Sequence, residues 1–242
     1  MEAIRIESLT KKYKDVIAVD DLSLTIEQGE LISLLGVNGA GKTTTIKMLS
    51  CLTKPTSGDA YLLGNSIMHD EVAVKKVIAV SPQETAIAPG LTVKENLELM
   101  YGVYGFSKVD RDEKIKNVMD ILGLNEVEKR KSGKLSGGWK RRLSIAMALI
   151  GEPKVLFLDE PTLGLDVIAR SELWDVIRTL KGEVTIILTT HYMEEAESLS
   201  DRIAIMKNGK LLVFDTSEQI KKMANVDKFE EAFIQIVKGV TK

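Results

Sequence analysis

The expected fold of this chain is decided by the stretch Gly36-Val37-Asn38-Gly39-Ala40-Gly41-Lys42-Thr43-Thr44. A glycine, four further residues and then Gly-Lys-Thr form the phosphate-loop pattern. The mostly apolar run 31–35 before it predicts a short buried strand, and residues 44–49 after it predict the start of a helix. A strand, a glycine loop and a helix in that order direct backbone amides at phosphate oxygens, at the positive end of the helix dipole. The alternative is a glycine-rich turn before an ordinary helix, which the complete pattern and both flanks disfavour.

The residues of this loop match the needs of a bound nucleotide. Its glycines permit close approach of the backbone to phosphate groups. Lys42 reaches the β- and γ-phosphates, and the Thr43 hydroxyl is a ligand for Mg²⁺. We therefore expect residues 36–44 to hold the phosphates of a nucleotide together with Mg²⁺.

Length and composition indicate an ordinary globular domain. The chain has 242 residues, 28% charged and 44% apolar, which suffices for one large core. Its net charge of −2 leaves no basic footprint, so nucleic acid is not an expected partner. Cys51 is the only cysteine, which rules out an internal disulfide and suits a reducing compartment. The first residues lack a secretion signal, and no apolar run approaches the ~20 residues that cross a bilayer. We expect a cytoplasmic protein that reaches a membrane only through a partner.

The apolar pattern predicts an α/β fold with two kinds of sheet. Alternation over residues 4–26 predicts antiparallel strands with one buried face. Buried strands separated by helical segments predict a mainly parallel sheet, the core of a P-loop NTPase. These strands are expected at 77–80, 155–158, 184–188 and 202–206, with a further strand at 60–63.

Helical periodicity fills the middle and the end of the chain. Residues 92–104 and 110–122 predict helices, which indicates a helical insertion from about residue 84 to 135. A second helical segment is expected at 139–150, and an amphipathic helix at about 225–242. We expect residues 1–242 to form a single domain that contains this insertion.

Two carboxylates follow the buried strand 155–158. Ligands gather at the carboxyl ends of parallel strands, so Asp159 is expected beside the phosphate loop, where it holds Mg²⁺ or its water shell. Glu160, one position further on, is the candidate for polarising the attacking water. The alternative for this pair is a surface turn with two solvated acids, which the nearby phosphate loop disfavours.

Two further polar residues also follow predicted strands. His191 is placed to donate a hydrogen bond to a γ-phosphate oxygen. Gln83 is placed to contact Mg²⁺ and water, although an isolated glutamine is a weak signal. A histidine after a strand is often structural, and we assign no function to His69.

A second anion site is predicted at Ser136-Gly137-Gly138, which precede the helical segment 139–150. The serine hydroxyl and the glycine amides lie at a helix N-terminus. One nucleotide does not need two such termini within one compact subunit. A symmetric dimer explains both, because it places the second terminus over the nucleotide of the neighbouring subunit.

In their order along the chain, these motifs resemble those of the ATP-binding-cassette ATPases. The resemblance rests on the phosphate loop and on five further motifs, Ser81-Pro82-Gln83, Leu135 to Gly138, Asp159-Glu160-Pro161-Thr162, Gly164-Leu165-Asp166 and Thr190-His191. It implies ATP as the nucleotide and Mg-dependent hydrolysis, with Lys42, Gln83, Glu160 and His191 as catalytic residues. Stacking of Tyr13 on adenine is implied too, although a hairpin residue that packs on the sheet is the alternative for Tyr13.

The resemblance also implies an assembly. Ser136 to Gly138 would act on the nucleotide of a second subunit, identical or paired, and Asp166 would link the two sites. The helical insertion would dock on an integral membrane permease at the inner face of the cell membrane, with Gln83 at its hinge. Residues 89–97, 191–197 and 229–233 resemble the drug- and ion-export branch, in which ATPase and permease are often separate chains.

Trp139 departs from the pattern, since relatives usually have a smaller or polar residue after the two glycines. It would pack on the partner subunit or be a neutral variation.

Two alternative functions for the chain are a non-transport cassette that regulates a macromolecular assembly and a small-molecule kinase. The chain shows no tandem cassette, coiled coil or basic arm typical of the former, and a kinase would not explain Leu135 to Gly138.

Overall fold

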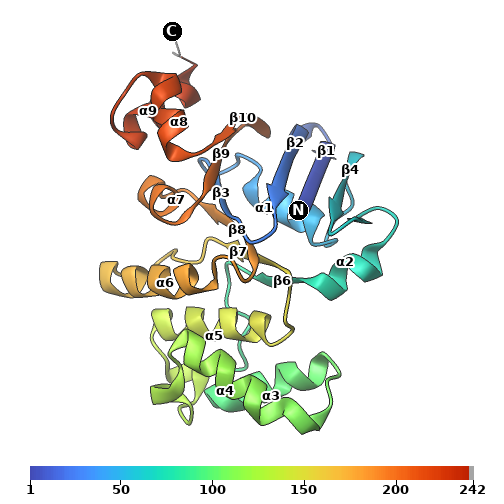
Figure 1. Ribbon diagram of the computed structural model, residues 1–242, viewed down its shortest axis with the longest axis vertical. Helices are drawn as coiled ribbons and strands as arrows, with labels where there is room; N and C mark the ends of the chain where they lie inside the picture. The colour runs from blue at the N-terminus through green and yellow to red at the C-terminus, as the bar shows by residue number, and fades with distance from the viewer. Residues whose placement is uncertain (240–242) are drawn as a thin grey trace.

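Two β-sheets organise the chain in a computed structural model that describes residues 1–239, apart from the side chain of Lys108 (Figure 1). The larger, six-stranded sheet has the order β10-β9-β3-β8-β7-β6. All its neighbouring strands are parallel except β10, which forms an antiparallel hairpin with β9. Its strands are β3 (Leu31–Leu35), β6 (Ile78–Ser81), β7 (Val155–Asp159), β8 (Thr185–Thr190), β9 (Arg202–Lys207) and β10 (Lys210–Asp215). The predicted mainly parallel sheet is confirmed.

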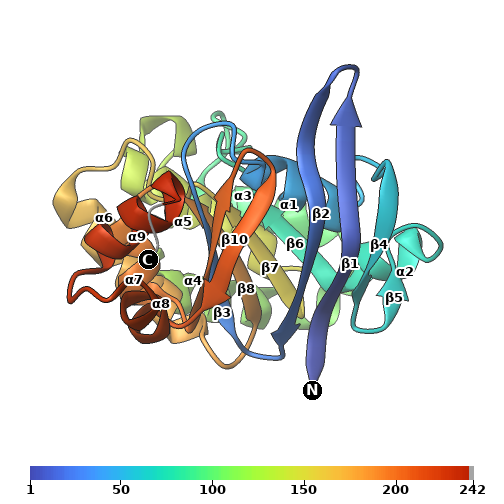
Figure 2. The same ribbon diagram turned by 90° about the horizontal axis from the view of Figure 1, so that it is seen from above.

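The smaller sheet is antiparallel and lies to one side of the larger one (Figure 2). Its order is β2-β1-β4-β5. The strands are β1 (Glu2–Tyr13), β2 (Val16–Glu27), β4 (Ser57–Leu62) and β5 (Asn65–Ser66). This sheet confirms the antiparallel strands expected at the N-terminus, and β4 begins three residues before the predicted strand.

Helices cover the larger sheet on both faces, as a parallel sheet requires. The α-helices of the described residues are α1 (Lys42–Leu49), α2 (Glu71–Val77), α3 (Val93–Val103), α4 (Arg111–Leu122), α5 (Gly137–Leu149), α6 (Val167–Leu180), α7 (Met193–Leu199), α8 (Ser217–Ala224) and α9 (Phe229–Lys238). Short 3-10 turns occupy Lys108–Asp110, Asn125–Val127 and Ser132–Lys134.

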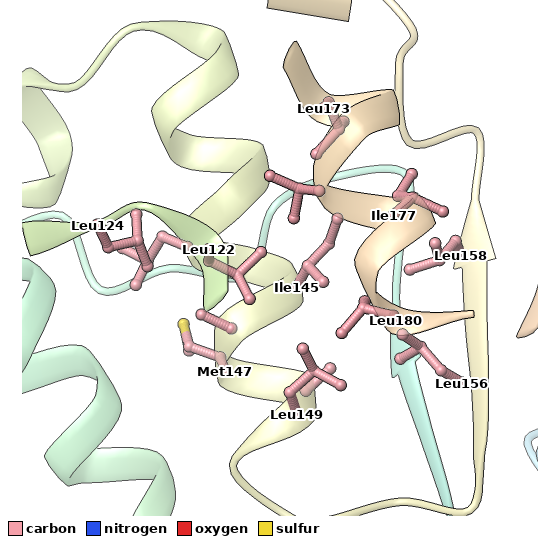
Figure 3. Close-up of a cluster of buried hydrophobic side chains, with 14 of the residues drawn as sticks. Leu122, Leu124, Ile145, Met147, Leu149, Leu156, Leu158, Leu173, Ile177 and Leu180 are labelled. Carbon is pink, nitrogen blue, oxygen red and sulfur yellow. The ribbon is translucent and has the colours of Figure 1, made fainter. Parts of the chain in front are cut away.

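Strand β7 shows how the two faces are built. Val155 and Phe157 belong to the cluster that joins α1 to the antiparallel sheet. Leu156 and Leu158 belong to the cluster formed with α5 and α6, part of which is drawn in Figure 3. Successive strand residues point to opposite faces, so a strand buried on both sides is apolar throughout. The polar residues Asp159 and Glu160 therefore begin only where the strand leaves the core.

The helical insertion lies at the end of the molecule opposite α8 and α9 (Figure 1). Helix α3 begins with a capping box, because the Thr92 hydroxyl accepts from the Glu95 amide and the Glu95 carboxylate accepts from the Thr92 amide. Leu122 and Leu124 at the end of α4 share a cluster with Ile145 of α5 (Figure 3). The insertion is thus packed on α5, and α5 in turn packs on β7 of the larger sheet.

The starts of three helices differ by two or more residues from the sequence predictions. Helices α1 and α5 begin two residues earlier than expected, at Lys42 and Gly137. Glycines are poor helix formers, which is why the glycine-rich segments concealed both starts. The C-terminal helix begins at Phe229 instead of about residue 225, because Asn225 adopts a left-handed conformation that ends a separate helix, α8. The last part of that prediction, residues 240–242, lies outside the described residues.

Within residues 1–239, no helix combines the length and the apolar character needed to cross a membrane.

Candidate functional site

The phosphate loop joins β3 to α1 and lines a cleft of about 560 Å³. Glycines are needed in this loop for two reasons: neighbouring atoms leave no room for a Cβ atom, and one backbone angle is unfavourable for other residues. A Cβ atom on Gly36 would lie 2.4 Å from the Met206 carbonyl oxygen. Gly41 has a φ of +105°, and its Cβ atom would lie 2.5 Å from the Ala18 carbonyl oxygen. The loop is therefore wedged between β2 and β9, with its other side open to the cleft.

Lys42 is the first residue of α1, and its side chain is buried at 6% exposure. Its ammonium group donates a hydrogen bond to the Gly36 carbonyl oxygen at 2.7 Å. It also lies 3.4 Å from Glu160 Oε1. The loop thus holds a buried cation whose partner charge comes from the residue that follows β7.

Asp159 ends β7 and lies next to the phosphate loop, where the sequence predicted it. Thr43 donates its hydroxyl hydrogen to Asp159 Oδ1 at 3.1 Å. Thr189 of β8 donates to the same oxygen at 2.5 Å. Thr189 was not predicted from the sequence, although a threonine within an apolar strand, two residues before His191, was a signal for it.

Glu160 turns back into the cleft through an unusual backbone conformation. Its φ of 48° is left-handed, which for a glutamate costs on the order of 1–3 kcal/mol. Two acceptors on Thr189 bind the Glu160 amide, the carbonyl oxygen at 3.2 Å and the hydroxyl at 3.0 Å. Backbone strain that is maintained by neighbouring hydrogen bonds is common at functional sites. The conformation aims the carboxylate at the phosphate loop.

His191 follows β8 and meets Glu160 in the cleft. Its Nδ1 lies 2.7 Å from Glu160 Oε2, and a proton on Nδ1 donates to that carboxylate. Lys42 and His191 therefore contact different oxygens of one buried carboxylate. The structure brings together Lys42 of the phosphate loop and the two residues, Glu160 and His191, that the sequence placed after separate strands.

Gln83 also lines the cleft, and its backbone is held by an arginine to which the sequence assigned no role. Arg141 of α5 donates to the carbonyl oxygens of Pro82 and Gln83, both at 2.6 Å. Burial lowers the pKa of this guanidinium, and the Asp159 carboxylate opposes that shift. No local pattern distinguishes Arg141 from its neighbour Arg142. The contact links α5 to the Gln83 loop.

Tyr13 is not among the residues that line the cleft. It pairs with Val16 at the end of the β1–β2 hairpin, is 44% exposed and lies under the Lys11 ammonium group. The cleft wall on this side is formed by Val16, Ile17 and Ala18. Their apolar surface lies beside the loop residues Asn38 to Thr44.

Ser136, Gly137 and Gly138 also lie outside this cleft. Ser136 occupies the N-cap position of α5, but its exposed hydroxyl makes no capping hydrogen bond. Cβ atoms on the two glycines would lie 3.3 Å from Leu165 and 3.2 Å from Ala169. The glycines therefore permit close packing at the start of α6 and leave the helix terminus of α5 open to solvent.

The last two residues with predicted roles lie near that open terminus. Asp166 caps α6, since its Oδ1 accepts from the Ala169 amide at 2.9 Å. Trp139 packs on the α5–α6 cluster of its own chain, and the Arg142 guanidinium lies 5.1 Å from the centre of its ring. The structure thus gives Trp139 an intramolecular contact.

Comparison with known proteins gives a consistent result. Residues 19–163 match the family model described as ABC transporter. Over 90% of this chain, the sequence is 39% identical to the daunorubicin/doxorubicin resistance ATP-binding protein DrrA of Streptomyces peucetius, of which 67% is covered. It is 45% identical over 86% of its length to the human phospholipid-transporting ATPase ABCA3. The chain spans only 12% of that protein's length.

The fold also matches solved structures. One is the dimeric, post-hydrolysis state of the ATP-binding cassette MJ0796 bound to ADP and Pi. The TM-score is 0.77 at 27% sequence identity, covering 88% of this chain and 98% of that one. The similarity therefore covers most of the present chain and confirms the expected fold class.

Proposed function

The chain belongs to the ABC transporter family, and from this membership we propose that it is an ATP-hydrolysing motor subunit that drives export through a separate membrane permease. One observation carries the proposal. Lys42 and Glu160 lie 3.4 Å apart in the cleft beside the phosphate loop, and Asp159 contacts Thr43 of that loop. That arrangement provides a cation for phosphate, an oxygen ligand for a metal and a carboxylate for water activation.

The residues beside the loop fit Mg²⁺. Thr43 Oγ1 and Asp159 Oδ1 are 3.1 Å apart, and the Gln83 amide lines the same cleft. These are oxygen donors, the type that Mg²⁺ prefers. We propose that Thr43, Asp159 and Gln83 hold Mg²⁺ directly or through water, and that the bound ion supplies charge neutralisation for the β- and γ-phosphates.

We propose that binding of ATP releases Glu160 from Lys42. In the structure the Lys42 ammonium lies 3.4 Å from Glu160 Oε1. A phosphate anion on the loop competes with that carboxylate for the same cation. Glu160 then accepts a proton from the attacking water, while His191 and the amides of residues 36–44 stabilise phosphate charge. Catalysis by this arrangement is mainly positional and electrostatic.

The open helix terminus at Ser136 to Gly138 supports a two-chain site. It carries an unused hydroxyl and lies outside the cleft of its own chain. In our proposal it contacts the nucleotide of a second subunit, identical or paired, and Asp166 links the two sites. Tyr13 stacks on adenine beside the apolar wall of residues 16–18. The dimeric state of the related cassette MJ0796 is consistent with this assembly.

We propose that one domain, residues 1–242, performs this function at the inner face of the cell membrane. The insertion at about 84–135 would contact the permease, and the Gln83 loop would connect that contact to the nucleotide. The relatives are described as a drug-resistance ATP-binding protein and as a phospholipid-transporting ATPase. Their names favour export of an apolar or amphipathic compound through the permease.

The test is ATP hydrolysis by the purified chain with Mg²⁺ and with excess EDTA. We expect hydrolysis only with Mg²⁺, and we expect Asp159→Asn to raise the Mg²⁺ concentration needed for half-maximal rate. Exposed Asp175→Asn is the matched control. Equal rates with and without Mg²⁺ would exclude the metal site. Absence of the chain from permease-containing membranes, in cells that express both, would exclude the motor role.

A further inference from the structure

Glu195 is a fully buried carboxyl group that the proposed reaction does not use. It lies on α7 with 0% exposure, whereas its neighbour Glu194 is exposed. Burial of a carboxyl group is unfavourable unless hydrogen bonds or charges compensate it. A buried glutamate within four residues of His191 therefore needs a structural explanation.

The contacts of Glu195 come from three different segments. Trp174 of α6 donates its indole N–H to Glu195 Oε1 at 3.0 Å. The hydroxyls of Thr162 and Thr190 lie close enough to lower the pKa of the carboxyl group, although neither forms a hydrogen bond of ordinary geometry with it. Among residues 1–239, Glu195 Oε2 and Thr162 Oγ1 are buried atoms without a hydrogen-bond partner.

These contacts connect the functional segments of the site. Thr162 comes two residues after Glu160, and Thr190 directly precedes His191. Helix α6, which carries Trp174, is capped by Asp166. A single carboxyl group on α7 thus lies close to two segments of the site. One carries the candidate base Glu160, and the other carries the candidate phosphate contact His191.

Glu195 interacts electrostatically with charged groups of the site. Burial raises the pKa of its carboxyl group above the ordinary value, and the Glu160 carboxylate adds to that increase. Arg141 is the cation that interacts with it, since the Glu195 charge opposes the lowering of the Arg141 pKa. Glu195 is therefore electrostatically coupled to the site as well as packed against it.

We propose that Glu195 is a positioning residue for ATP hydrolysis, which holds the Glu160–Thr162 segment in register with the His191 turn. This inference rests on the proposed function. The Thr162 hydroxyl on the first segment and the Thr190 hydroxyl on the second both lie near this carboxyl group. Oε1 accepts from the indole of Trp174, and Oε2, which has no hydrogen-bond partner among residues 1–239, remains available to these hydroxyls.

The test compares Glu195→Ala, Glu195→Gln and Thr162→Val with exposed Glu194→Gln as the control. We expect Glu195→Ala to lower kcat by about 10- to 100-fold, because small displacements of reacting groups have effects of that order. KM for ATP should change less than about twofold, since the phosphate loop is untouched. Glu195→Gln should recover a large part of kcat, because its amide oxygen still accepts from Trp174. Glu194→Gln should match the wild type.

Thr162→Val shows whether the carboxyl group acts through this segment. Valine keeps the shape and removes a buried hydroxyl that lies near Glu195 and has no hydrogen-bond partner among the described residues. We expect a lower kcat from this variant, and no further loss when it is combined with Glu195→Ala. Additive losses would indicate two unrelated structural effects and would contradict the inference.

The outcomes separate this inference from the proposed function. If the wild type and Glu194→Gln do not hydrolyse ATP, the proposed function fails. If both hydrolyse ATP while Glu195→Gln and Thr162→Val have wild-type kcat, only the role of Glu195 fails. These two conservative variants decide the question even if Glu195→Ala does not fold. A parallel change in KM and kcat would likewise contradict a positioning role.

Discussion

The N-termini of helices α1 and α5 are both preceded by small residues, but their surroundings differ. At α1, Lys42 and Glu160 line one cleft, and Asp159 contacts the Thr43 hydroxyl beside it. At α5, the Ser136 hydroxyl is exposed and caps nothing. The first terminus has charged partners from the end of β7, whereas among the described residues the Ser136 hydroxyl has no capping partner. This difference is the basis of our proposal that α1 carries a catalytic half-site and α5 a complementary half-site for another subunit.

The largest expected effect is at the first terminus. Lys42→Ala removes the cation that faces bound phosphate and leaves the Glu160 carboxylate without this partner. We expect ATP hydrolysis to fall by more than about 10²-fold, the effect of losing one fixed charge-stabilising donor. Exposed Lys47→Ala on the same helix is the matched control and should keep full activity. A coupled phosphate-release assay measures both, and wild-type turnover by Lys42→Ala would refute the assignment of this loop.

Glu160→Gln should affect the chemical step more than binding. The amide preserves the shape and removes the base, so we expect hydrolysis to fall by roughly 10²- to 10⁴-fold while ATP still binds. Trapped ATP should then hold two chains together. Light scattering with Mg·ATP should detect a dimer of this variant and a monomer without nucleotide, with exposed Glu183→Gln as the control. A variant that binds ATP and stays monomeric would contradict a dimer formed by this chain alone.

A third experiment tests directly whether the α5 terminus serves another subunit. Mixed dimers of differently tagged chains carry Lys42→Ala and Ser136→Arg, either on separate chains or on one chain. If each site combines Lys42 of one chain with Ser136 of the other, separate lesions fall in the same site and leave the second intact. We expect about half of the wild-type trapping of labelled nucleotide with vanadate, and almost none when one chain carries both lesions. The reverse order would show that the two residues act within one chain.

The sequence was sufficient to predict the first terminus because its residues lie at strand ends. A parallel sheet brings such ends together, so Lys42, Asp159, Glu160 and His191 were placed from pattern alone. No comparable rule predicts contacts between residues that are far apart in the sequence. The hydrogen bonds of Arg141 to the Gln83 loop join positions 58 residues apart, and sequence periodicity contains no information about them.

The fold was predicted with the same limits. Continuous apolar strands and the alternating N-terminal strands indicated both sheets, since each pattern reflects burial of one or two faces. Helix α8 and the early starts of α1 and α5 were not predicted, because glycine and polar residues at these positions obscure the periodicity. The left-handed conformation of Glu160 was not predictable from its residue type, because it depends on the hydrogen bonds that Thr189 makes.

The smallest expected effect concerns Trp139, which lies three residues beyond the open terminus of α5 but packs on its own chain. Its ring contacts the α5–α6 cluster and the Arg142 guanidinium. We expect Trp139→Gln to lower the free energy of unfolding by about 1–2 kcal/mol through lost packing and cation–π contact. Trp139→Phe, which keeps a ring, should lose less. Because the contact is intramolecular, ATP hydrolysis and the ATP-dependent dimer of Glu160→Gln should remain within about twofold of their values with Trp139. Urea unfolding measures the first effect, and light scattering in the Glu160→Gln background measures the second. A dimer that weakens while stability is unchanged would instead place Trp139 in the interface, and so extend the complementary half-site beyond Ser136.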